Sequence, residues 1–158
     1  MATWILTGSQ ENFRIYVERG FDVIGVKERR RRQAAELEPG DEIVFYIAKS
    51  SGDRLKPVPG QTRGQAFGGV ARVTSEMFED REPIWPQNPK KGPEAYPWRV
   101  EAEPVTVLAE EDFVPAEELA ARLEHVRKWP SEHWHLAFQG QLRTVCDADA
   151  RLLRSRIA

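Results

Sequence analysis

The chain has 158 residues, 41% of them apolar and 30% charged, with a formal net charge of −2. This composition fits one globular domain over residues 1–158, whose core needs no disulfide because Cys146 is the single cysteine. The net charge excludes a general attraction to polyanions, so any nucleic-acid contact must come from a local patch. The opening MATWILTG lacks the features of a signal peptide, and no apolar run approaches the ~18 to 20 residues of a membrane helix. We therefore expect a cytoplasmic protein with no membrane partner.

The first 48 residues predict strands that alternate with helical segments. Residues 3–6 are typical of a short strand, and residues 10–19 of a helix capped by Ser9. Residues 21–26 predict a second strand, followed by a highly charged helical connection over residues 27–38. After the turn Pro39-Gly40-Asp41, residues 42–48 are apolar on both faces, which is typical of a strand in the middle of a sheet.

Two further strands are predicted over residues 65–75 and 96–108. The first contains the pair Gly68-Gly69, which permits a bulge or a close approach of another backbone. The second is interrupted by Pro104, which removes one hydrogen-bond donor and indicates a bend or a sheet edge.

After residue 110 the apolar pattern becomes helical. A helix is predicted to open at Pro115 and to bury Leu119, Leu123 and Val126, and a closing helix is predicted after Asp147. Strands followed by helices indicate an α+β fold. Five or six short strands of this kind predict a small mixed, mostly antiparallel β-barrel with surrounding helices.

No motif for catalysis, metal binding or a nucleotide cofactor is visible. His133 and His135 would share a face only in a strand, whereas Ser131-Glu132 indicates a helix start, and the common zinc-site spacings are absent. Cys146 has no assignable histidine partner, and the motifs of serine hydrolases and phosphate-binding loops are absent. We predict no catalytic residue, no metal and no cofactor.

The strongest local positive charge lies just after the second predicted strand. It is formed by Lys27, Arg29, Arg30, Arg31 and Arg32, with Glu28 inside the run and Glu36 and Glu38 after it. Such a run is either a solvated helix face or a surface that contacts phosphates. The residue pattern leaves both interpretations open.

Aromatic residues are the other candidates for binding. For three of the five tryptophans, Trp4, Trp129 and Trp134, we favour a role in packing. Trp85 lies in a proline-rich stretch without periodicity, between two predicted strands that are far apart in sequence, so we favour a ligand-facing role. Trp98 alternates with Val100 and is predicted to face either the barrel interior or a pocket.

The chain carries an ordered set of short motifs: Trp4-Ile5, Ser9-Gln10-Glu11-Asn12-Phe13, Gly25-Val26, Leu37-x-Pro39-Gly40-Asp41, Gly69-Val70 to Thr74-Ser75, Tyr96-Pro97-Trp98-Arg99-Val100 and Phe138-x-Gly140-x-x-Arg143. Together these motifs resemble the EVE-domain family of small, stand-alone prokaryotic proteins. EVE domains are PUA-like and related to the YTH domains that hold N6-methyladenine in an aromatic cage. The resemblance implies a PUA-like fold and recognition of a modified base in DNA or RNA, in a bacterial protein.

The resemblance also implies where a base would bind. Trp85 corresponds to the tryptophan of the cage loop, and the end of the first strand supplies polar contacts from Thr7, Gly8 and Ser9. The position before Gly25 is occupied by Ile24, where related proteins can carry a second tryptophan.

The leading hypothesis is a non-enzymatic module that accepts an unpaired or flipped base between Trp85 and apolar groups including Ile24, with Gly25 and Trp98 also in the pocket. The cations at 27 and 29–32, together with Lys90 and Lys91, would hold flanking phosphates. One alternative is an enzyme acting on a nucleobase or nucleoside, which predicts a perturbed titrating group in the pocket. The other is a protein-interaction domain that uses residues 79–97, which predicts an exposed apolar patch.

Overall fold

The computed structural model describes residues 1–48, 65–80, 82, 96–120, 122–127, 137–138 and 142–157. Among these residues, no helix is long and apolar enough to cross a membrane. In chain order the elements are β1 (Thr3–Gly8), α1 (Gln10–Glu18), β2 (Val23–Val26), η1 (Glu28–Arg30), α2 (Arg31–Ala35), β3 (Glu42–Ile47), β4 (Ala66–Val73), β5 (Phe78–Glu79), β6 (Trp98–Val107), η3 (Glu110–Asp112), β7 (Val114–Pro115), α3 (Glu117–Ala120), α4 (Glu124–Arg127), β8 (Leu142–Val145) and α5 (Asp147–Ile157).

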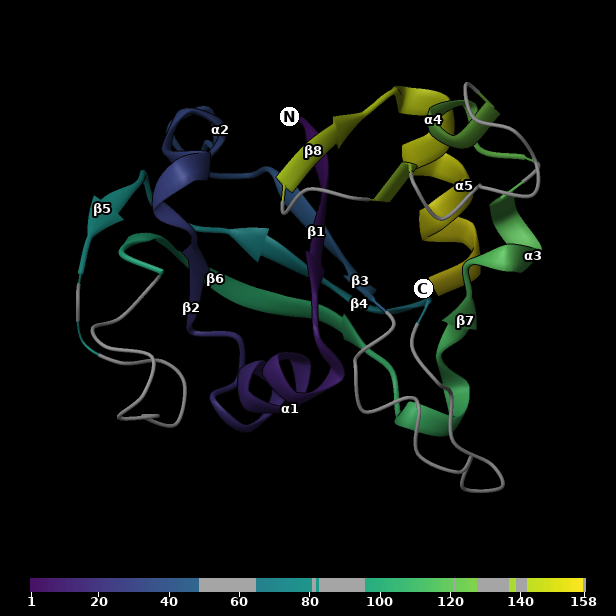
Figure 1. The fold of residues 1–158 in the computed structure, drawn as a ribbon, viewed down its shortest axis with the longest axis horizontal. Helices are drawn as coiled ribbons and strands as arrows, with labels where there is room; N and C mark the ends of the chain where they lie inside the picture. Colours follow the sequence, from purple (N-terminus) through teal and green to yellow (C-terminus); the bar gives the residue numbers. More distant parts are fainter. Residues whose placement is uncertain are drawn as a thin grey trace.

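The strands form one curled sheet in the order β2-β6-β4-β3-β1-β8, with β5 beside β6 and β7 beside β4 (Figure 1). The β1–β3 pairing is parallel and the other pairings are antiparallel, as predicted for a mixed, mostly antiparallel sheet. The two end strands, β2 and β8, do not pair with each other in the described part of the chain. The prediction of a closed barrel is therefore wrong, and the sheet is a half-barrel.

A side chain from α1 explains why the sheet can end at β2. The hydroxyl of Tyr16 accepts the backbone N–H of Gly25 at 3.1 Å and donates to the carbonyl of the same residue at 3.5 Å. Both backbone groups thereby find a partner without another strand. Tyr16 is buried, and this burial raises the pKa of its phenol. Helix α2 packs against both β6 and β8 and so lies between these two strands on the open side of the half-barrel.

The centre of the sheet follows the sequence prediction. All six residues of β3 are buried, as expected for a strand that is apolar on both faces. Its pairing with β4 shifts register at Gly68, where a Cβ atom would come within 2.9 Å of side chains of Phe13 and Ile47. A Cβ atom on Gly69 would lie 2.6 Å from the carbonyl oxygen of Thr106 on β6. The glycine pair therefore permits both a bulge and a close approach of neighbouring groups.

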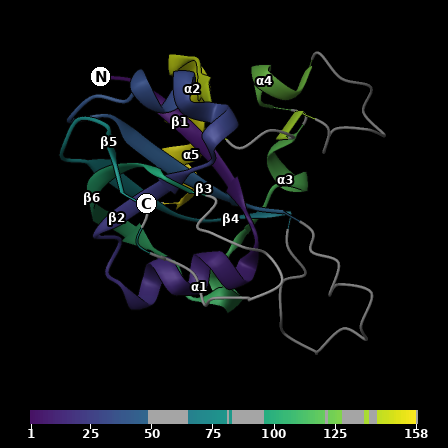
Figure 2. The same ribbon diagram turned by 60° about the vertical axis from the view of Figure 1, so that its left-hand side comes forward.

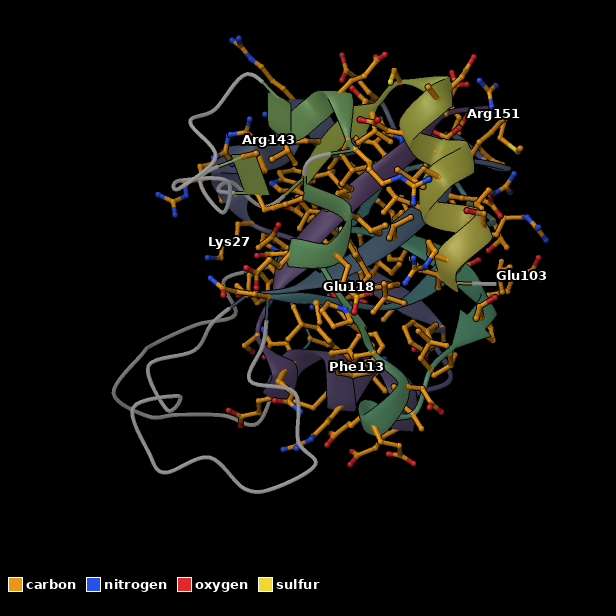
Figure 3. All side chains as sticks on the ribbon, turned by 90° about the vertical axis from the view of Figure 1, so that its right-hand side faces the viewer. Lys27, Glu103, Phe113, Glu118, Arg143 and Arg151 are labelled. Carbon is orange, nitrogen blue, oxygen red and sulfur yellow. The ribbon has the colours of Figure 1, made fainter. Side chains whose placement is uncertain are left out.

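The hydrophobic core has two clusters. One contains Phe13, Phe21 and Phe45 and lies between α1 and the sheet, with the rings of Phe13 and Phe45 5.6 Å apart. The other contains Leu119, Leu123 and Leu153 and joins α3 and α5 to the sheet. In Figure 3, side chains fill the space between the sheet and α5. Through each cluster a different set of helices packs against the sheet, and Figure 2 shows α1 and α5 at separate places around it.

The predicted packing role of Trp4 is confirmed. Its indole is 3% exposed, and Nε1 donates a hydrogen bond to Oδ2 of Asp41 at 3.1 Å. The Asp41 carboxylate also accepts the backbone N–H groups of Ala2 and Glu38. The turn before β3 therefore fixes the beginning of β1 as well as reversing the chain.

Candidate nucleic-acid interface

The predicted basic run lies on η1 and α2, immediately after β2. Arg29, Arg31 and Arg32 are exposed and Arg30 is half-buried. In the described part of the chain, residues 29–32 form no ion pair, whereas arginines elsewhere, such as Arg14 and Arg19, contact carboxylates. Residues 29–32 therefore present a local surplus of positive charge on a protein whose net charge is negative.

Two aromatic residues lie directly beneath these cations. The ammonium of Lys27 lies 5.7 Å from the ring centroid of Tyr96, and the guanidinium of Arg31 lies 4.5 Å from that of Trp98. Trp98 is also fixed from two other directions. It is opposite Val26 in the β2–β6 pairing, and its Nε1 donates to Oε2 of Glu28 at 2.8 Å. We call this surface, residues 27–32 with Tyr96 and Trp98, the basic ledge.

The basic ledge is suited to holding phosphates. A cation–π contact fixes the direction of a flexible basic side chain, and the N–H groups at the rim of the Arg31 guanidinium can still donate to oxygen. An arginine presents a planar fork that matches phosphate geometry. Holding this fork in one direction favours phosphate binding over a side chain that rotates freely. The contacts with Tyr96 and Trp98 do not decide between a solvated helix face and a surface that contacts phosphates.

The residues predicted at the end of β1 are already engaged within the protein. The hydroxyl of Thr7 donates to the carbonyl of Phe138 at 2.9 Å, and the carbonyl of Gly8 accepts the N–H of Ala48 at 2.8 Å. The hydroxyl of Ser9 accepts the N–H of Asn12 at 3.1 Å, which confirms its predicted role as the cap of α1. The space beside Gly8 is open, since a Cβ atom placed there would meet no atom within 4 Å.

The residues predicted at the end of β2 are buried. Ile24 has no exposed surface and belongs to the core cluster that contains Phe13 and Phe21. Gly25 is hydrogen-bonded to Tyr16 as described above. In this structure a ligand has no accessible surface of Ile24 to contact.

The structure brings together some of the predicted site residues and separates others. Trp98 lies against the basic run on the basic ledge. Strand β1 ends beside α1, and β2 begins near α1 and ends beside α2, at the opposite ends of the strands (Figure 1). The end of β1, with Thr7, Gly8 and Ser9, is therefore at the opposite end of the strands from the basic ledge. Trp85, Lys90 and Lys91 lie outside the described residues, as do Trp129, Trp134, His133 and His135.

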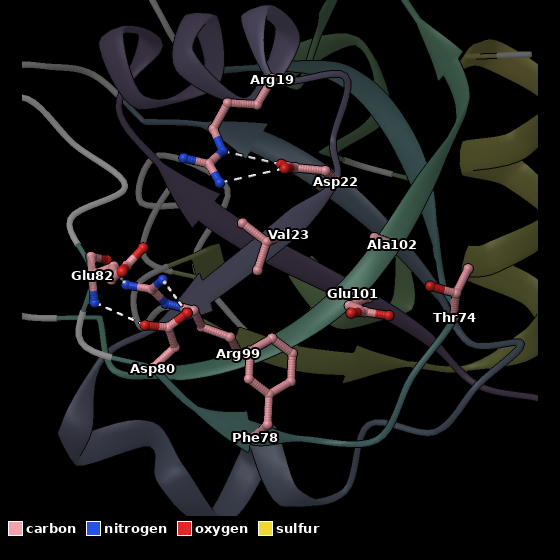
Figure 4. Close-up of a pocket in the computed structure, with 10 residues that line it drawn as sticks. All are labelled: Arg19, Asp22, Val23, Thr74, Phe78, Asp80, Glu82, Arg99, Glu101 and Ala102. Atoms are coloured by element: carbon pink, nitrogen blue, oxygen red, sulfur yellow. Dashed lines mark hydrogen bonds and ion pairs between the residues drawn. The ribbon is translucent and has the colours of Figure 1, made fainter.

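A depression of about 520 Å³ lies on the other side of β6, next to β2 and β5 (Figure 4). The buried guanidinium of Arg99 lies at one end of it, and the ion pair of Arg19 with Asp22 lies at the other. Arg99 belongs to the motif Tyr96-Pro97-Trp98-Arg99-Val100, but no role was predicted for it from the sequence. Its alternation with Trp98 along the strand was the available signal, because alternate residues of a strand face opposite sides. The lining residues are Arg19, Asp22, Val23, Thr74, Phe78, Asp80, Glu82, Arg99, Glu101 and Ala102.

The shifted ionisable groups have structural causes. Burial raises the pKa of Tyr16, and burial raises the pKa of Tyr46 to about 12. A hydrogen bond from Arg14 lowers the pKa of Glu110 on the surface. None of these three groups lines the depression, and the described residues contain no cluster of metal-ligating side chains.

The comparisons with known proteins agree on one family and one fold. A family model described as EVE domain matches residues 2–151. A UPF0310 protein of the archaeon Pyrococcus abyssi is 26% identical over 157 residues, covering 98% of this chain and 99% of the relative. A UPF0310 protein of Pyrococcus horikoshii is also 26% identical over 157 residues, covering 97% of each chain.

Two solved structures share the fold and carry nucleic acid. The human THYN1 protein, in complex with DNA containing 5-methylcytosine, has 14% identity and a TM-score of 0.57, with 98% of this chain and 96% of that chain covered. The YTH domain of Zygosaccharomyces rouxii MRB1, in complex with N6-methyladenosine RNA, has 13% identity and a TM-score of 0.60, with 98% of this chain and 84% of that chain covered. At these identities the likeness shows the fold alone.

Proposed function

Since this chain belongs to the EVE domain family, we propose that it is a nucleic-acid-binding module whose basic ledge contacts phosphates. The observation that carries the proposal is the pair of cation–aromatic contacts, Lys27 over Tyr96 and Arg31 over Trp98. Lys27 directly precedes η1 and Arg31 begins α2, so the two cations lie within one short stretch of chain that could follow neighbouring phosphates of one strand. With a net charge of −2 on the whole protein, this local surface has to supply the attraction.

The finer part of the proposal is recognition of a modified base. Its support is the resemblance of the chain to EVE and YTH domains, two of whose structural relatives hold DNA with 5-methylcytosine and RNA with N6-methyladenosine. In this proposal Trp85 stacks on the base and the ledge holds the neighbouring phosphates. Because Ile24 has no exposed surface, a base would contact it only after the surrounding packing opened.

The two alternatives receive less support from the described residues. An enzyme would need a perturbed titrating group in its pocket, and none of the groups with a shifted pKa lines the described depression. A protein-interaction domain would need a broad apolar patch. The exposed large apolar side chains in the described part are Met1, Val17, Val105 and Val107, and only the last two are near each other in sequence.

Binding of oligonucleotides at several salt concentrations tests the phosphate part of the proposal. The double variant Lys27→Gln/Arg31→Gln should bind roughly tenfold more weakly near physiological salt, and the slope of log K against log salt should become shallower by about 2 for duplex DNA. The control is Arg122→Gln/Arg151→Gln, which removes the same charge from exposed sites between α3 and α4 and on α5. Equal losses and equal slopes for the two double variants would rule out the ledge as the phosphate-contacting surface.

The base-recognition part needs matched oligonucleotides with cytosine or 5-methylcytosine and with adenine or N6-methyladenine, each single-stranded and duplex. We expect wild type to prefer one modified oligonucleotide and Trp85→Ala to lose this preference while its salt slope stays that of wild type. A preference that survives in Trp85→Ala would exclude Trp85 as the stacking residue.

A further inference from the structure

The guanidinium of Arg99 is held by three acceptors at the end of the depression in Figure 4. Arg99 is 3% exposed; its Nε donates to the carbonyl of Tyr96 at 3.2 Å, and its Nη1 lies 3.5 Å from Oδ2 of Asp80. Its Nη2 donates to the carbonyl of Glu82. A buried charge is costly unless it is paired and hydrogen-bonded, and these three contacts meet that need.

The three acceptors come from two separate stretches of chain. Asp80 and Glu82 precede residues 83–95, and Tyr96 follows them. Two more hydrogen bonds strengthen the junction, because the N–H of Asp80 donates to the carbonyl of Pro97 and the N–H of Glu82 donates to Oδ1 of Asp80, both at 2.9 Å. One side chain of β6 therefore joins the chain before residue 83 to the chain after residue 95.

The same junction supports the basic ledge from behind. Tyr96 precedes β6 and has no place in its ladder, yet its ring lies under the ammonium of Lys27. Trp98 and Arg99 are consecutive, so their side chains leave β6 on opposite faces. Arg99 donates to the carbonyl of Tyr96 from the side of the depression, while the ring of Tyr96 contacts Lys27 on the ledge.

We propose that Arg99 is a positioning residue for nucleic-acid binding, which fixes Tyr96 beneath Lys27 and joins the two ends of residues 83–95. Arg99 acts through these residues and not by touching nucleic acid, because its guanidinium is buried and its three contacts are all within the protein. This inference rests on the function proposed above. Lysine cannot replace arginine here, because an ammonium carries its three N–H donors on one nitrogen. It lacks the planar fork whose separate nitrogens reach three separated acceptors.

The test compares Arg99→Lys with Arg19→Lys. Arg19 lines the same depression and pairs with Asp22 at 3.0 Å, but it does not contact residue 80, 82 or 96. Both variants keep the charge, so the net field of the protein is unchanged. Binding to the oligonucleotide that wild type prefers, its salt slope, thermal unfolding and hydrogen exchange of the Asp80 amide are measured for each variant.

For Arg99→Lys we expect at least roughly fivefold weaker binding and a salt slope shallower by about 1, as when one phosphate contact is lost. The Asp80 amide should exchange faster than in wild type, because its bond to Pro97 is no longer supported. For Arg19→Lys, the affinity and the exchange rate of the Asp80 amide should stay within about twofold of wild type, and the salt slope should stay that of wild type. Should Arg99→Lys fail to fold, Asp80→Asn weakens one of the three contacts at a side chain that is 40% exposed, and should shift binding and exchange in the same direction.

Wild-type affinity and slope in a folded Arg99→Lys or Asp80→Asn would overturn the inference, and equal losses in Arg19→Lys would also overturn it. Absence of binding by wild type to every oligonucleotide would instead overturn the proposed function. The exchange rate of the Asp80 amide would then still decide whether Arg99 holds the junction.

Discussion

Arginines gather both on the basic ledge and around the carboxylate of Glu42, and the two regions hold them differently. On the ledge, Arg31 stacks on Trp98. At the other site, Arg72 and Arg154 pair with Glu42, the first residue of β3, whose side chain is 2% exposed. The two Glu42 oxygens have no other partner in the described structure, so these ion pairs compensate the buried charge.

The difference shows what each arrangement does with a positive charge. An arginine that neutralises a buried carboxylate is needed for folding and has little charge left for a ligand. An arginine that stacks on an aromatic ring is equally ordered but keeps its charge and its donors. The comparison therefore predicts that changes around Glu42 affect stability, while changes on the ledge affect binding.

The largest effect is expected for Arg72→Ala/Arg154→Ala, which leaves the Glu42 carboxylate buried without a cation. We expect a loss of about 2 to 3 kcal/mol in the free energy of unfolding, below the ~3 to 5 kcal/mol of a fully buried pair because both guanidinium groups are nearly half exposed. Denaturant unfolding measures the loss, and oligonucleotide affinity should stay within about twofold of wild type.

The control adds Glu42→Gln to the same two changes and should recover most of the lost stability, because no charge is then buried. If the double alanine variant unfolds as wild type does but binds like the Lys27/Arg31 variant, the division between the two regions is wrong.

A smaller effect is expected for Glu28→Gln on the ledge, and it is a gain in oligonucleotide affinity instead of a loss of stability. The Glu28 carboxylate accepts from Trp98 but also places a negative charge among the cations. At about 7 Å from a phosphate in water, that charge costs about 0.6 kcal/mol, so its removal should raise affinity about threefold at low salt. The glutamine oxygen can still accept from Trp98, so this hydrogen bond should be kept.

The gain from Glu28→Gln should disappear near 1 M salt, where the Debye length is about 3 Å. Titration of wild type and variant against one oligonucleotide at low and high salt measures it. An affinity that does not change at low salt would show that phosphates do not approach Glu28.

The smallest effect is expected for Glu110→Gln, which breaks an ion pair with Arg14 at 2.5 Å on the surface. The hydrogen bond from Arg14 lowers the pKa of Glu110, so the stabilising contribution is present above the ordinary glutamate pKa and is lost as the pH falls through the lowered value. Because both side chains are about a third or more exposed, the contribution at pH 7 should be less than about 0.5 kcal/mol.

Thermal unfolding of wild type and Glu110→Gln at pH 7 and at pH 3 measures this difference, which should be smaller at pH 3. If Glu110→Gln loses as much stability as the Arg72/Arg154 variant, then an ion pair contributes to folding stability as strongly at the surface as around a buried carboxylate.

Local patterns in the sequence predicted much of the fold. The two apolar faces of residues 42–47 identify the central strand, and Ser9 marks the start of α1, because strand burial and helix capping depend on neighbouring residues. The ends of the sheet could not be predicted in this way. Whether β2 needs a further neighbour depends on the hydroxyl of Tyr16, which reaches Gly25 from a different element.

The helical region after residue 115 shows the same limit. Leu119, Leu123 and Val126 are buried, as predicted from their spacing, but they lie on or beside two short helices and not on one. The N–H of Glu124 is accepted at 2.8 Å by the carboxylate of Asp149 on α5, so a new helix can begin there. This partner is 25 residues away, and no local pattern indicates it.

The candidate site was predicted in part for a comparable reason. The basic run and Trp98 were each recognised from residue type, because charge and aromatic character are properties of single residues. Their stacking depends on the β2–β6 register, which the sequence does not display. The support given by Arg99 depends on contacts with two stretches of chain that are adjacent only after folding.

The pairing of β8 with β1 also constrains the order of folding. Thr3 is opposite Val145, so the outer edge of β1 receives its partner from a segment that leaves the ribosome long after β1 itself. Until then β1 has an unpaired edge, and such edges readily pair with other chains. Contacts between residues so far apart in sequence also slow folding, because a long loop must close before any of them forms. The period between synthesis of β1 and arrival of β8 is therefore when this chain is most exposed to aggregation.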